Sequence, residues 1–319
     1  MGALLEVRDL TVRFPSFDAV AGLGFAVRDG ETVALVGESG SGKSLTALAI
    51  MGLVPRPGRI VTGSIRFAGR DLVGLAEPEL RRLRGRDVAM IFQEPMTSLN
   101  PVLTIGFQVA ETLRLHENLS ARQARRRAVE LLDLVRLPDP ARRIDDFPHR
   151  LSGGMRQRVM IAMAIACRPR ILIADEPTTA LDVTIQAQVI DLLDRLRREL
   201  GMALLLITHD LGVVAQWADR VVVMYAGRKV EEADPAPLLD APLHPYSRGL
   251  LAASPRLNAH VHYRQGPLVE IQGSMASAVG QAGCPFVPRC GVRRESCAQA
   301  MPPLREISPS RFVACPVAA

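Results

Sequence analysis

The sequence predicts an α/β fold whose core is a mainly parallel β-sheet. Four short, largely apolar runs, at residues 33–36, 171–174, 203–207 and 220–224, have the composition of strands that are buried on both faces. Segments with helical spacing lie between these runs, and a glycine-rich loop joins the first run to a helix. Hydrophobic residues make up 48% of the 319 residues, which is enough for a sizeable buried core.

The start of the chain predicts an antiparallel β part ahead of this core. Apolar residues alternate along residues 10–14 and again along residues 23–27, which is the pattern of strands with one buried face. Asp29 and Gly30 then mark a turn before the first buried run. We therefore expect paired N-terminal strands that precede the parallel sheet.

A helical subdomain is predicted at about residues 95–150, inserted into the α/β core. Ser120 and Gln123 match a capping box at the start of a helix. After them, apolar residues fall on one helical face through residues 124–135. The core and this insertion together define a first domain of residues 1–235.

A small C-terminal extension, residues 236–319, is predicted after this domain. The pattern changes there to short elements with many prolines. The extension also holds four of the five cysteines of the chain. We therefore treat it as a separate, cysteine-bearing part.

Composition narrows the class of protein. No apolar run approaches the roughly 20 residues of a membrane-spanning helix, and the N-terminus lacks the basic-then-apolar pattern of a signal peptide. We therefore expect a cytosolic protein that reaches a membrane only through partners. The net charge is +6, but aromatic residues make up only 4% of the chain, which favours solvated basic faces over a nucleic-acid groove.

Residues 37–44 (GESGSGKS) match a phosphate-binding P-loop. The glycines let backbone N–H groups surround a polyphosphate, Lys43 reaches its β and γ phosphates, and Ser44 ligates Mg²⁺. The alternative is a glycine turn between strand and helix, but the chain has only two lysines and places one of them here. We expect ATP to contact Gly37, Glu38, Ser39, Gly40, Ser41, Gly42, Lys43, Ser44 and Leu45.

The apolar run at residues 171–174 ends in two carboxylates, Asp175 and Glu176. Side chains in this position lie at the C-terminal edge of a parallel sheet, where α/β proteins bind ligands. Asp175 is expected to hold Mg²⁺, and Glu176 to act as the general base toward the attacking water. The alternative role for such acids is a helix N-cap.

A third segment, residues 151–158 (LSGGMRQR), begins an apolar helix just before that strand. Ser152, Gly153 and Gly154 present a hydroxyl and backbone N–H groups at the helix start, which makes a second anion site. This segment resembles the LSGGQ signature of ABC ATPases. The order of the motifs along the chain is also similar to that family.

The resemblance implies roles for further residues. Gln93 stands at the family's Q-loop, and is expected to act in catalysis and to contact both ATP and Mg²⁺. Residues 180–182 stand at the D-loop, which places Asp182 near the nucleotide, and His209 stands at the catalytic switch histidine. Phe14 falls where the family stacks an aromatic ring on adenine. Considered alone, His209 would be a packed histidine and Phe14 a core residue.

The resemblance covers about residues 4–235 and implies a shared mechanism. Two ATPase domains close head to tail, and each ATP lies between the P-loop of one chain and residues 152–154 of the other. The chain departs from the family pattern at Leu45, Met155 and Thr179. These departures remove no catalytic group, so both halves of the site are expected to be competent.

Other ABC ATPases act in DNA repair, chromosome cohesion and translation. The repair and cohesion types insert a coiled coil or zinc modules between P-loop and signature, and the translation factors carry two cassettes. Here 106 residues without heptads separate Ser44 from Leu151, and the chain has one cassette. A transporter subunit is therefore preferred over a non-transport ATPase.

Two segments resemble the dipeptide and oligopeptide importers: residues 90–101 (MIFQEPMTSLNP) and residues 244–251 (HPYSRGLL). The resemblance implies an ATP-hydrolysing import subunit at the cytoplasmic face of the inner membrane. Its expected partners are a second, homologous ATPase subunit on a different chain (an identical chain is the alternative), two permease subunits and an extracytoplasmic solute-binding protein, with no nucleic acid. Importers of nickel, glutathione and other solutes share these features, so the solute stays open.

Four cysteines of the extension, Cys284, Cys290, Cys297 and Cys315, are separated by 5, 6 and 17 residues. Clustered thiols in a cytosolic protein favour a metal site over disulfides. The spacing is wider than in zinc knuckles, and two of the cysteines precede proline, as some iron–sulfur ligands do. The family resemblance also implies a [4Fe–4S] cluster, with zinc or free thiols as alternatives. Because all four lie outside the catalytic motifs, losing one is expected to leave the P-loop chemistry intact.

Overall fold

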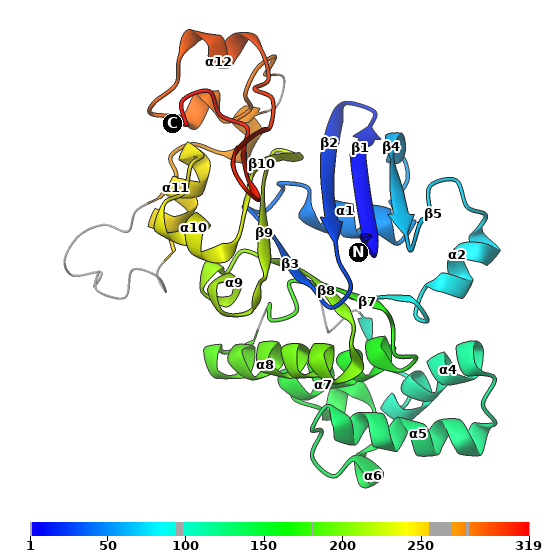
Figure 1. Cartoon of the computed structure of the whole chain (residues 1–319). Helices are drawn as coiled ribbons and strands as arrows, with labels where there is room; N and C mark the ends of the chain where they lie inside the picture. The colour runs from blue at the N-terminus through cyan, green and yellow to red at the C-terminus, as the bar shows by residue number, and fades with distance from the viewer. Residues whose placement is uncertain (1, 94–97, 180, 255–269, 279–280, 319) are drawn as a thin grey trace. The chain divides into compact units, whose positions relative to one another are not determined.

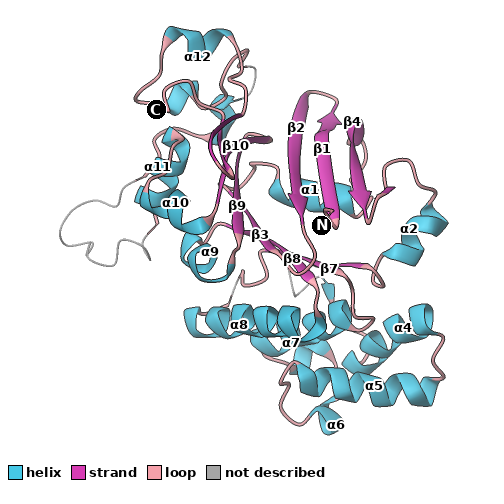
Figure 2. Ribbon diagram, viewed as in Figure 1, coloured by secondary structure: helices cyan, strands magenta, loops and turns pink. Residues whose placement is uncertain are grey.

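A computed structural model describes residues 2–93, 98–179, 181–254, 270–278 and 281–318 (Figure 1). The chain divides into two compact units. The first comprises Met1–Val27, Thr32–Val73 and Leu206–Ala319, and the second comprises Arg28–Glu31 and Gly74–Leu205. Each unit contains both helices and strands, so the predicted α/β class is confirmed (Figure 2).

The first unit opens with an antiparallel sheet, as predicted for the N-terminal part. Its strands, in the order β2-β1-β4-β5, are β1 (Leu5–Phe14), β2 (Phe17–Val27), β4 (Arg59–Phe67) and β5 (Arg70–Asp71). Leu10 and Val12 of β1 and Leu23 of β2 are fully buried. The alternation in the sequence therefore does mark the buried face of these strands.

Strand β3 (Thr32–Val36) leads through the glycine-rich loop into helix α1 (Lys43–Ile50). All residues of β3 are buried, and the strand runs parallel to β9 (Arg220–Tyr225). Helix α9 (Leu211–Trp217) precedes β9. The loop thus follows the carboxyl end of a buried parallel strand, which is the context that a P-loop requires.

A two-residue turn joins β9 to β10 (Arg228–Ala233), which runs antiparallel to it. Both turn residues have positive φ, 46° at Ala226 and 77° at Gly227, as in the tight turns of hairpins. Because so short a turn permits only antiparallel pairing, the sheet is mixed beyond β9.

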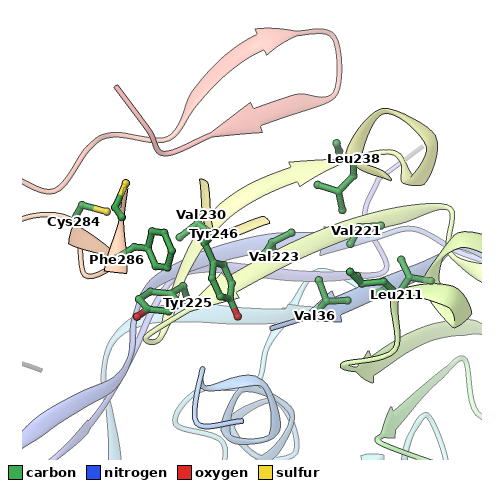
Figure 3. Close-up of a cluster of buried hydrophobic side chains, with 14 of the residues drawn as sticks. Val36, Leu211, Val221, Val223, Tyr225, Val230, Leu238, Tyr246, Cys284 and Phe286 are labelled. Carbon is green, nitrogen blue, oxygen red and sulfur yellow. The ribbon is translucent and has the colours of Figure 1, made fainter. Parts of the chain in front are cut away.

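The C-terminal extension adds strands and short helices to the same unit. Strand β12 (Arg311–Val313) pairs with β10, and β11 (Arg305–Ser308) pairs with β12, both antiparallel. The helices are α10 (Pro235–Asp240), α11 (Pro245–Ala252) and α12 (Glu295–Gln299), with 3-10 turns at Met275–Ala278 and Val287–Arg289. Side chains of the extension join those of β3 and β9 in one buried core (Figure 3). The extension therefore shares a core with the strand that carries the P-loop.

The second unit holds two parallel strands and most of the long helices. Strand β6 (Val88–Ile91) pairs with β7 (Ile171–Asp175). The helices are α2 (Glu77–Leu83), α4 (Ile105–Glu117), α5 (Ala121–Leu134), α6 (Pro140–Arg143), α7 (Gly153–Ile165) and α8 (Val183–Leu200), with a 3-10 turn at Pro148–Arg150. Strand β8 (Ala203–Thr208) begins in this unit and ends in the first. Across the described residues of both units, no helix combines the length and apolar character needed to span a membrane.

The predicted helix start at Ser120 is confirmed. Ser120 Oγ accepts a hydrogen bond from the Gln123 N–H at 3.4 Å, and Gln123 Oε1 accepts one from the Ser120 N–H at 3.0 Å. These two bonds form a capping box that satisfies otherwise unpaired donors at the start of α5. Ala124, Ala128 and Leu132 of the predicted apolar face are fully buried, so this helix packs as its pattern predicts.

Candidate nucleotide-binding site

The glycine-rich loop at residues 37–44 is held by close backbone contacts. Gly42 has a φ of 98°, and a Cβ there would lie 2.7 Å from the carbonyl oxygen of Ala19. A Cβ on Gly37 would overlap the carbonyl oxygen of Met224. A side chain at either position would therefore strain the loop or displace its neighbours. Helix α1 begins at Lys43, so its first N–H groups open toward the loop.

The side chain of Lys43 lies inside this loop and is only 4% exposed. Its ammonium donates to the carbonyl oxygens of Gly37 at 2.8 Å and Glu38 at 2.9 Å, and lies 3.4 Å from Ser41 Oγ. The charge is thus held within the segment that the motif assigns to phosphates. Of the other predicted contacts, Ser39 and Gly40 are exposed, whereas Ser44 and Leu45 are half-buried in the first turn of α1.

The structure brings Glu176 and Gln93 together. Strands β6 and β7 run side by side and parallel, so residues just beyond their carboxyl ends are neighbours. Glu176 Oε2 accepts hydrogen bonds from Gln93 Nε2 at 3.2 Å and from Thr179 Oγ1 at 3.0 Å. Glu176 has a φ of 44°, which is uncommon outside glycine and is often found at functional sites. Asp175, the preceding residue, is buried at the end of β7.

Ser152 begins helix α7, and its Oγ accepts a hydrogen bond from the Met155 N–H at 3.3 Å. A Cβ on Gly154 would lie 2.9 Å from Ile185 Cγ2, and one on Gly153 would lie 3.3 Å from a methyl group of Leu181. The double glycine therefore permits close packing of α7 against the segment that starts α8. Ser152 and Gly153 are both exposed, so this helix start is open to a ligand.

Two further predicted site residues are Asp182, at the start of a helix, and His209, just after a strand. Asp182 is exposed and caps α8, where its Oδ1 accepts from the Ile185 N–H at 3.0 Å. His209 is exposed just after β8. The next residue, Asp210, caps α9 by accepting from the Gly212 N–H at 2.9 Å. Ala180 of the D-loop and residues 94–97 of the importer-like segment lie outside the described residues.

Phe14, the predicted adenine contact, ends β1 and is half-buried. Its ring stacks on Phe17 at a centroid distance of 5.6 Å and an interplanar angle of 12°. A Cβ on Gly58 would lie 2.6 Å from Phe14 Cζ, so the ring also covers that backbone. The adenine contact stays a prediction.

The extension contacts the P-loop directly, which the sequence analysis missed. The guanidinium of Arg289 makes two bonds to the Glu38 carboxylate, from Nη1 to Oε2 at 2.6 Å and from Nη2 to Oε1 at 3.0 Å. The Glu38 N–H donates to the Tyr246 hydroxyl at 2.7 Å. The extension therefore lies against the P-loop through Arg289 and Tyr246. Cys290 follows Arg289 directly, so a change at this cysteine acts beside the contact.

The segment HPYSRGLL explains how Tyr246 reaches the loop. His244 Nδ1 accepts from the Tyr246 N–H at 3.0 Å and caps α11, with Pro245 as its first residue. The N–H groups of Leu243 and His244 each donate to the Glu231 carboxylate at 2.8 Å. Burial raises the pKa of Tyr246, so its hydroxyl stays protonated. The segment HPYSRGLL therefore contains the residue that contacts the P-loop, whereas nothing in the sequence distinguished Arg289 from the other arginines.

The four cysteines predicted as metal ligands are buried free thiols. Figure 3 shows Cys284 next to Phe286, in the core that also contains Tyr225 and Tyr246. Burial raises the pKa of the Cys284 thiol to about 11, and the other three cysteines of the extension raise it as well, so the four lie within electrostatic reach of one another. Within the described residues, no group of three or more His, Cys, Asp or Glu side chains is arranged to hold a metal ion. The four thiols are thus gathered in one core, and their role as cluster ligands stays a prediction.

Comparison with known proteins decides the family. The model of the family "ABC transporter" matches residues 20–179. The chain belongs to the ABC transporter family. A second model, "Oligopeptide/dipeptide transporter, C-terminal region", matches residues 230–297, which contain the segment HPYSRGLL and three of the four cysteines. Both predicted resemblances are therefore confirmed.

Relatives of this ABC ATPase extend over nearly its whole length. It is 51% identical over 318 residues to the oligopeptide transport ATP-binding protein OppD of Escherichia coli, covering 98% of this chain and 93% of OppD. It is 50% identical over 320 residues to the dipeptide transport ATP-binding protein DppD of Haemophilus influenzae, covering 98% of this chain and 95% of DppD.

Solved structures confirm the fold and the ATPase class. A dimeric post-hydrolysis state of the ATP-binding cassette MJ0796, bound to ADP and Pi, matches with a TM-score of 0.65 and 29% identity. The match covers 72% of this chain and 98% of that cassette. CbiO1 of Clostridium perfringens, part of the ABC transporter complex cbiONQ, matches with a TM-score of 0.65 and 25% identity, covering 76% of this chain and 92% of CbiO1. This chain is an ABC-type ATPase, as predicted.

Proposed function

We propose that this ATPase drives the uptake of dipeptides or oligopeptides through partner permeases. The observation that carries the proposal is the identity of 51% and 50% to oligopeptide and dipeptide transport proteins, over 98% of the chain and with the extension included. Nickel, glutathione or another solute is the alternative, since the solute is chosen by partners rather than by this chain.

In this function the P-loop backbone and Lys43 hold the β and γ phosphates of ATP, and Phe14 faces the adenine. The donor groups suit Mg²⁺, because the Ser44 hydroxyl, the Asp175 carboxylate and the Gln93 amide oxygen are the hard ligands that this ion prefers. Bound there, the ion would offset negative charge that develops on the phosphates.

Glu176 is the proposed general base. The hydrogen bonds from Gln93 and Thr179 fix its carboxylate at the end of β7. Backbone strain of the kind seen at Glu176 costs about 1–3 kcal/mol and persists where surrounding contacts impose it. Glu176 would accept a proton from the attacking water, while Gln93 orients that water and His209 completes the site.

A second ATPase chain is proposed to share the site. Ser152 and Gly153 are exposed at the start of α7, where the helix dipole and the N–H groups attract an anion. Asp182 is exposed at the start of α8. These positions suit contact with the γ-phosphate of ATP bound to the partner's P-loop. The partner is expected to be a homologous, different chain.

Exposed apolar side chains of the second unit offer a contact for the permeases. Val102 is 76% exposed, and Phe107 and Leu115, on one side of α4, are 46% and 72% exposed. Exposed apolar patches of sufficient size mark interaction surfaces. We propose that they hold the subunit against two permeases at the cytoplasmic face of the inner membrane, with an extracytoplasmic solute-binding protein delivering the solute.

Copurification tests this proposal. The tagged full-length chain should be recovered from detergent-solubilised membranes together with two multi-span permeases and a second ATPase, identified by mass spectrometry. Leu115→Asp should lower the recovery of the permeases, whereas Ile307→Asp, at an equally apolar exposed site on β11, should not. Recovery with nucleic acid and without membrane proteins would instead support a non-transport ATPase.

We also propose that Cys284, Cys290, Cys297 and Cys315 bind a [4Fe–4S] cluster. The observation that favours it is the gathering of four buried thiols, the ligand type of such clusters. Protein purified without oxygen should contain about four irons per chain and absorb broadly in the visible range. Stoichiometric zinc without iron would move the assignment to a zinc site. Metal-free protein with equal protease resistance in wild type and Cys290→Ser would reject both.

A further inference from the structure

The P-loop of this protein carries a carboxylate, Glu38, in the loop that binds a polyanion. Glu38 follows Gly37 directly, and its side chain is 28% exposed. A negative charge at this place repels the phosphates of ATP and lowers the affinity of the loop for them. A cation next to Glu38 would offset this repulsion.

Arg289 of the extension supplies that cation. Its side chain is only 3% exposed, and it meets the Glu38 carboxylate through two parallel bonds, at 2.6 and 3.0 Å. Paired bonds of this kind fix direction as well as charge. The side chain lies too deep to serve as an ordinary surface ion pair, which would contribute little.

The remaining donors of Arg289 are also occupied. Nε donates to the carbonyl oxygen of Gln272 at 2.8 Å, Nη2 to that of Ile271 at 2.9 Å, and Nη1 to the Tyr225 hydroxyl at 3.4 Å. The guanidinium also lies 5.8 Å from the centroid of the Tyr225 ring. The cation is thus held in one position by residues of the extension and by Tyr225.

A second tether acts on the backbone of the same residue. The Glu38 N–H donates to the buried Tyr246 hydroxyl at 2.7 Å, so this donor faces the extension. Tyr246 in turn packs on Tyr225 and on Phe286, at centroid distances of 4.6 and 5.5 Å. Both the carboxylate and the N–H of Glu38 are therefore fixed by the extension.

We propose that Arg289 is a positioning residue for nucleotide binding, which neutralises Glu38 and so makes the affinity of the P-loop for ATP depend on the folded extension. A structural tether alone would have a different signature. Its loss would disturb the loop whatever the charge at residue 38. Loss of neutralisation lowers the affinity for nucleotide only while Glu38 is ionised. This loss of affinity increases with the negative charge of the nucleotide.

A double-mutant cycle on the full-length subunit separates these two roles. We measure the dissociation constants of ATP and ADP for Arg289→Met, for Glu38→Gln and for the double variant. Coulomb's law for one unpaired charge about 10 Å from a triphosphate, at the dielectric constant of water, predicts about a tenfold loss of ATP affinity in Arg289→Met. The loss should be smaller for ADP. In the Glu38→Gln background, the same substitution should change ATP affinity less than about twofold.

Arg294→Met is the matched control, since it removes the same charge from an exposed site of the extension. It should bind ATP as the wild type does. Thermal unfolding and protease resistance show whether each variant keeps the extension folded. The proposal is overturned if Arg289→Met binds ATP normally, if the loss is equal for ATP and ADP, or if it persists undiminished in the Glu38→Gln background.

Discussion

Lowering the pH from about 7 to about 5 is expected to destabilise this protein through His244. Its side chain is 1% exposed, and Nδ1 accepts the hydrogen bond that caps α11. Burial, with a smaller effect of the Arg248 charge, lowers the pKa of His244 from 6.5 to about 3. The folded protein therefore keeps this imidazole neutral at pH values where the unfolded chain protonates it.

The sign and size of the effect follow from this difference. Because the pKa of His244 is lowered on folding, the contribution of this neutral imidazole to stability is fully present above about pH 6.5 and is lost as the pH falls toward 3. At pH 5 the unfolded chain binds nearly one proton more than the folded chain, and integration from pH 7 predicts a loss of about 2 kcal/mol in the free energy of unfolding. Protonation would also remove the cap of α11, the helix that carries Tyr246 to the P-loop.

Urea unfolding of the full-length protein at the two pH values measures this loss. His244→Asn keeps a side-chain acceptor for the cap but cannot be protonated. The wild type should lose about 2 kcal/mol more than this variant on acidification. His149→Asn, at an exposed histidine, should behave as the wild type does. Equal losses in the wild type and in His244→Asn would refute the reasoning.

Three further predictions concern catalysis, assembly and the core. Glu176→Gln should keep ATP binding but lose about 10²–10⁴-fold in hydrolysis, measured by phosphate release; near-normal turnover would exclude Glu176 as the base. Ser152→Arg should leave ATP binding by the isolated subunit unchanged and abolish hydrolysis by the assembled complex, so loss of binding in isolation would contradict the shared site. Phe286→Ala should cost about 3–5 kcal/mol in unfolding free energy because it removes a buried ring that packs edge-on against Tyr225; a change of about 0.5 kcal/mol or less, the usual cost of a surface substitution, would contradict this packing.

Features that depend on neighbours in the sequence could be predicted. The capping box at Ser120 and Gln123 follows from local hydrogen bonding, and the glycines of the P-loop follow from the strand–loop–helix context. The place of Asp175 and Glu176 at the edge of the sheet also follows, because both carboxylates come at the end of an apolar run. These features need no knowledge of distant parts of the chain.

Contacts between distant segments could not be predicted in the same way. Glu38 and Arg289 are 251 residues apart, and the chain contains many other arginines. Strand β12 has only three residues and pairs with β10 after a proline-rich stretch without strand periodicity. Both contacts depend on the shared core of β3, β9 and the extension, which no local pattern reveals. For the same reason, the cysteines were expected to act apart from the P-loop.

Peptide uptake by the reconstituted complex tests the central claim most directly. The ATPase, its copurified permeases and the second ATPase are placed in proteoliposomes. The solute-binding protein and a labelled dipeptide or oligopeptide are added on the side opposite the cytoplasmic face. Uptake should require ATP on the cytoplasmic face and should stop when this subunit carries Glu176→Gln, while the complex still assembles. Hydrolysis of ATP without peptide uptake, for every peptide tried, would contradict the assignment as a peptide importer.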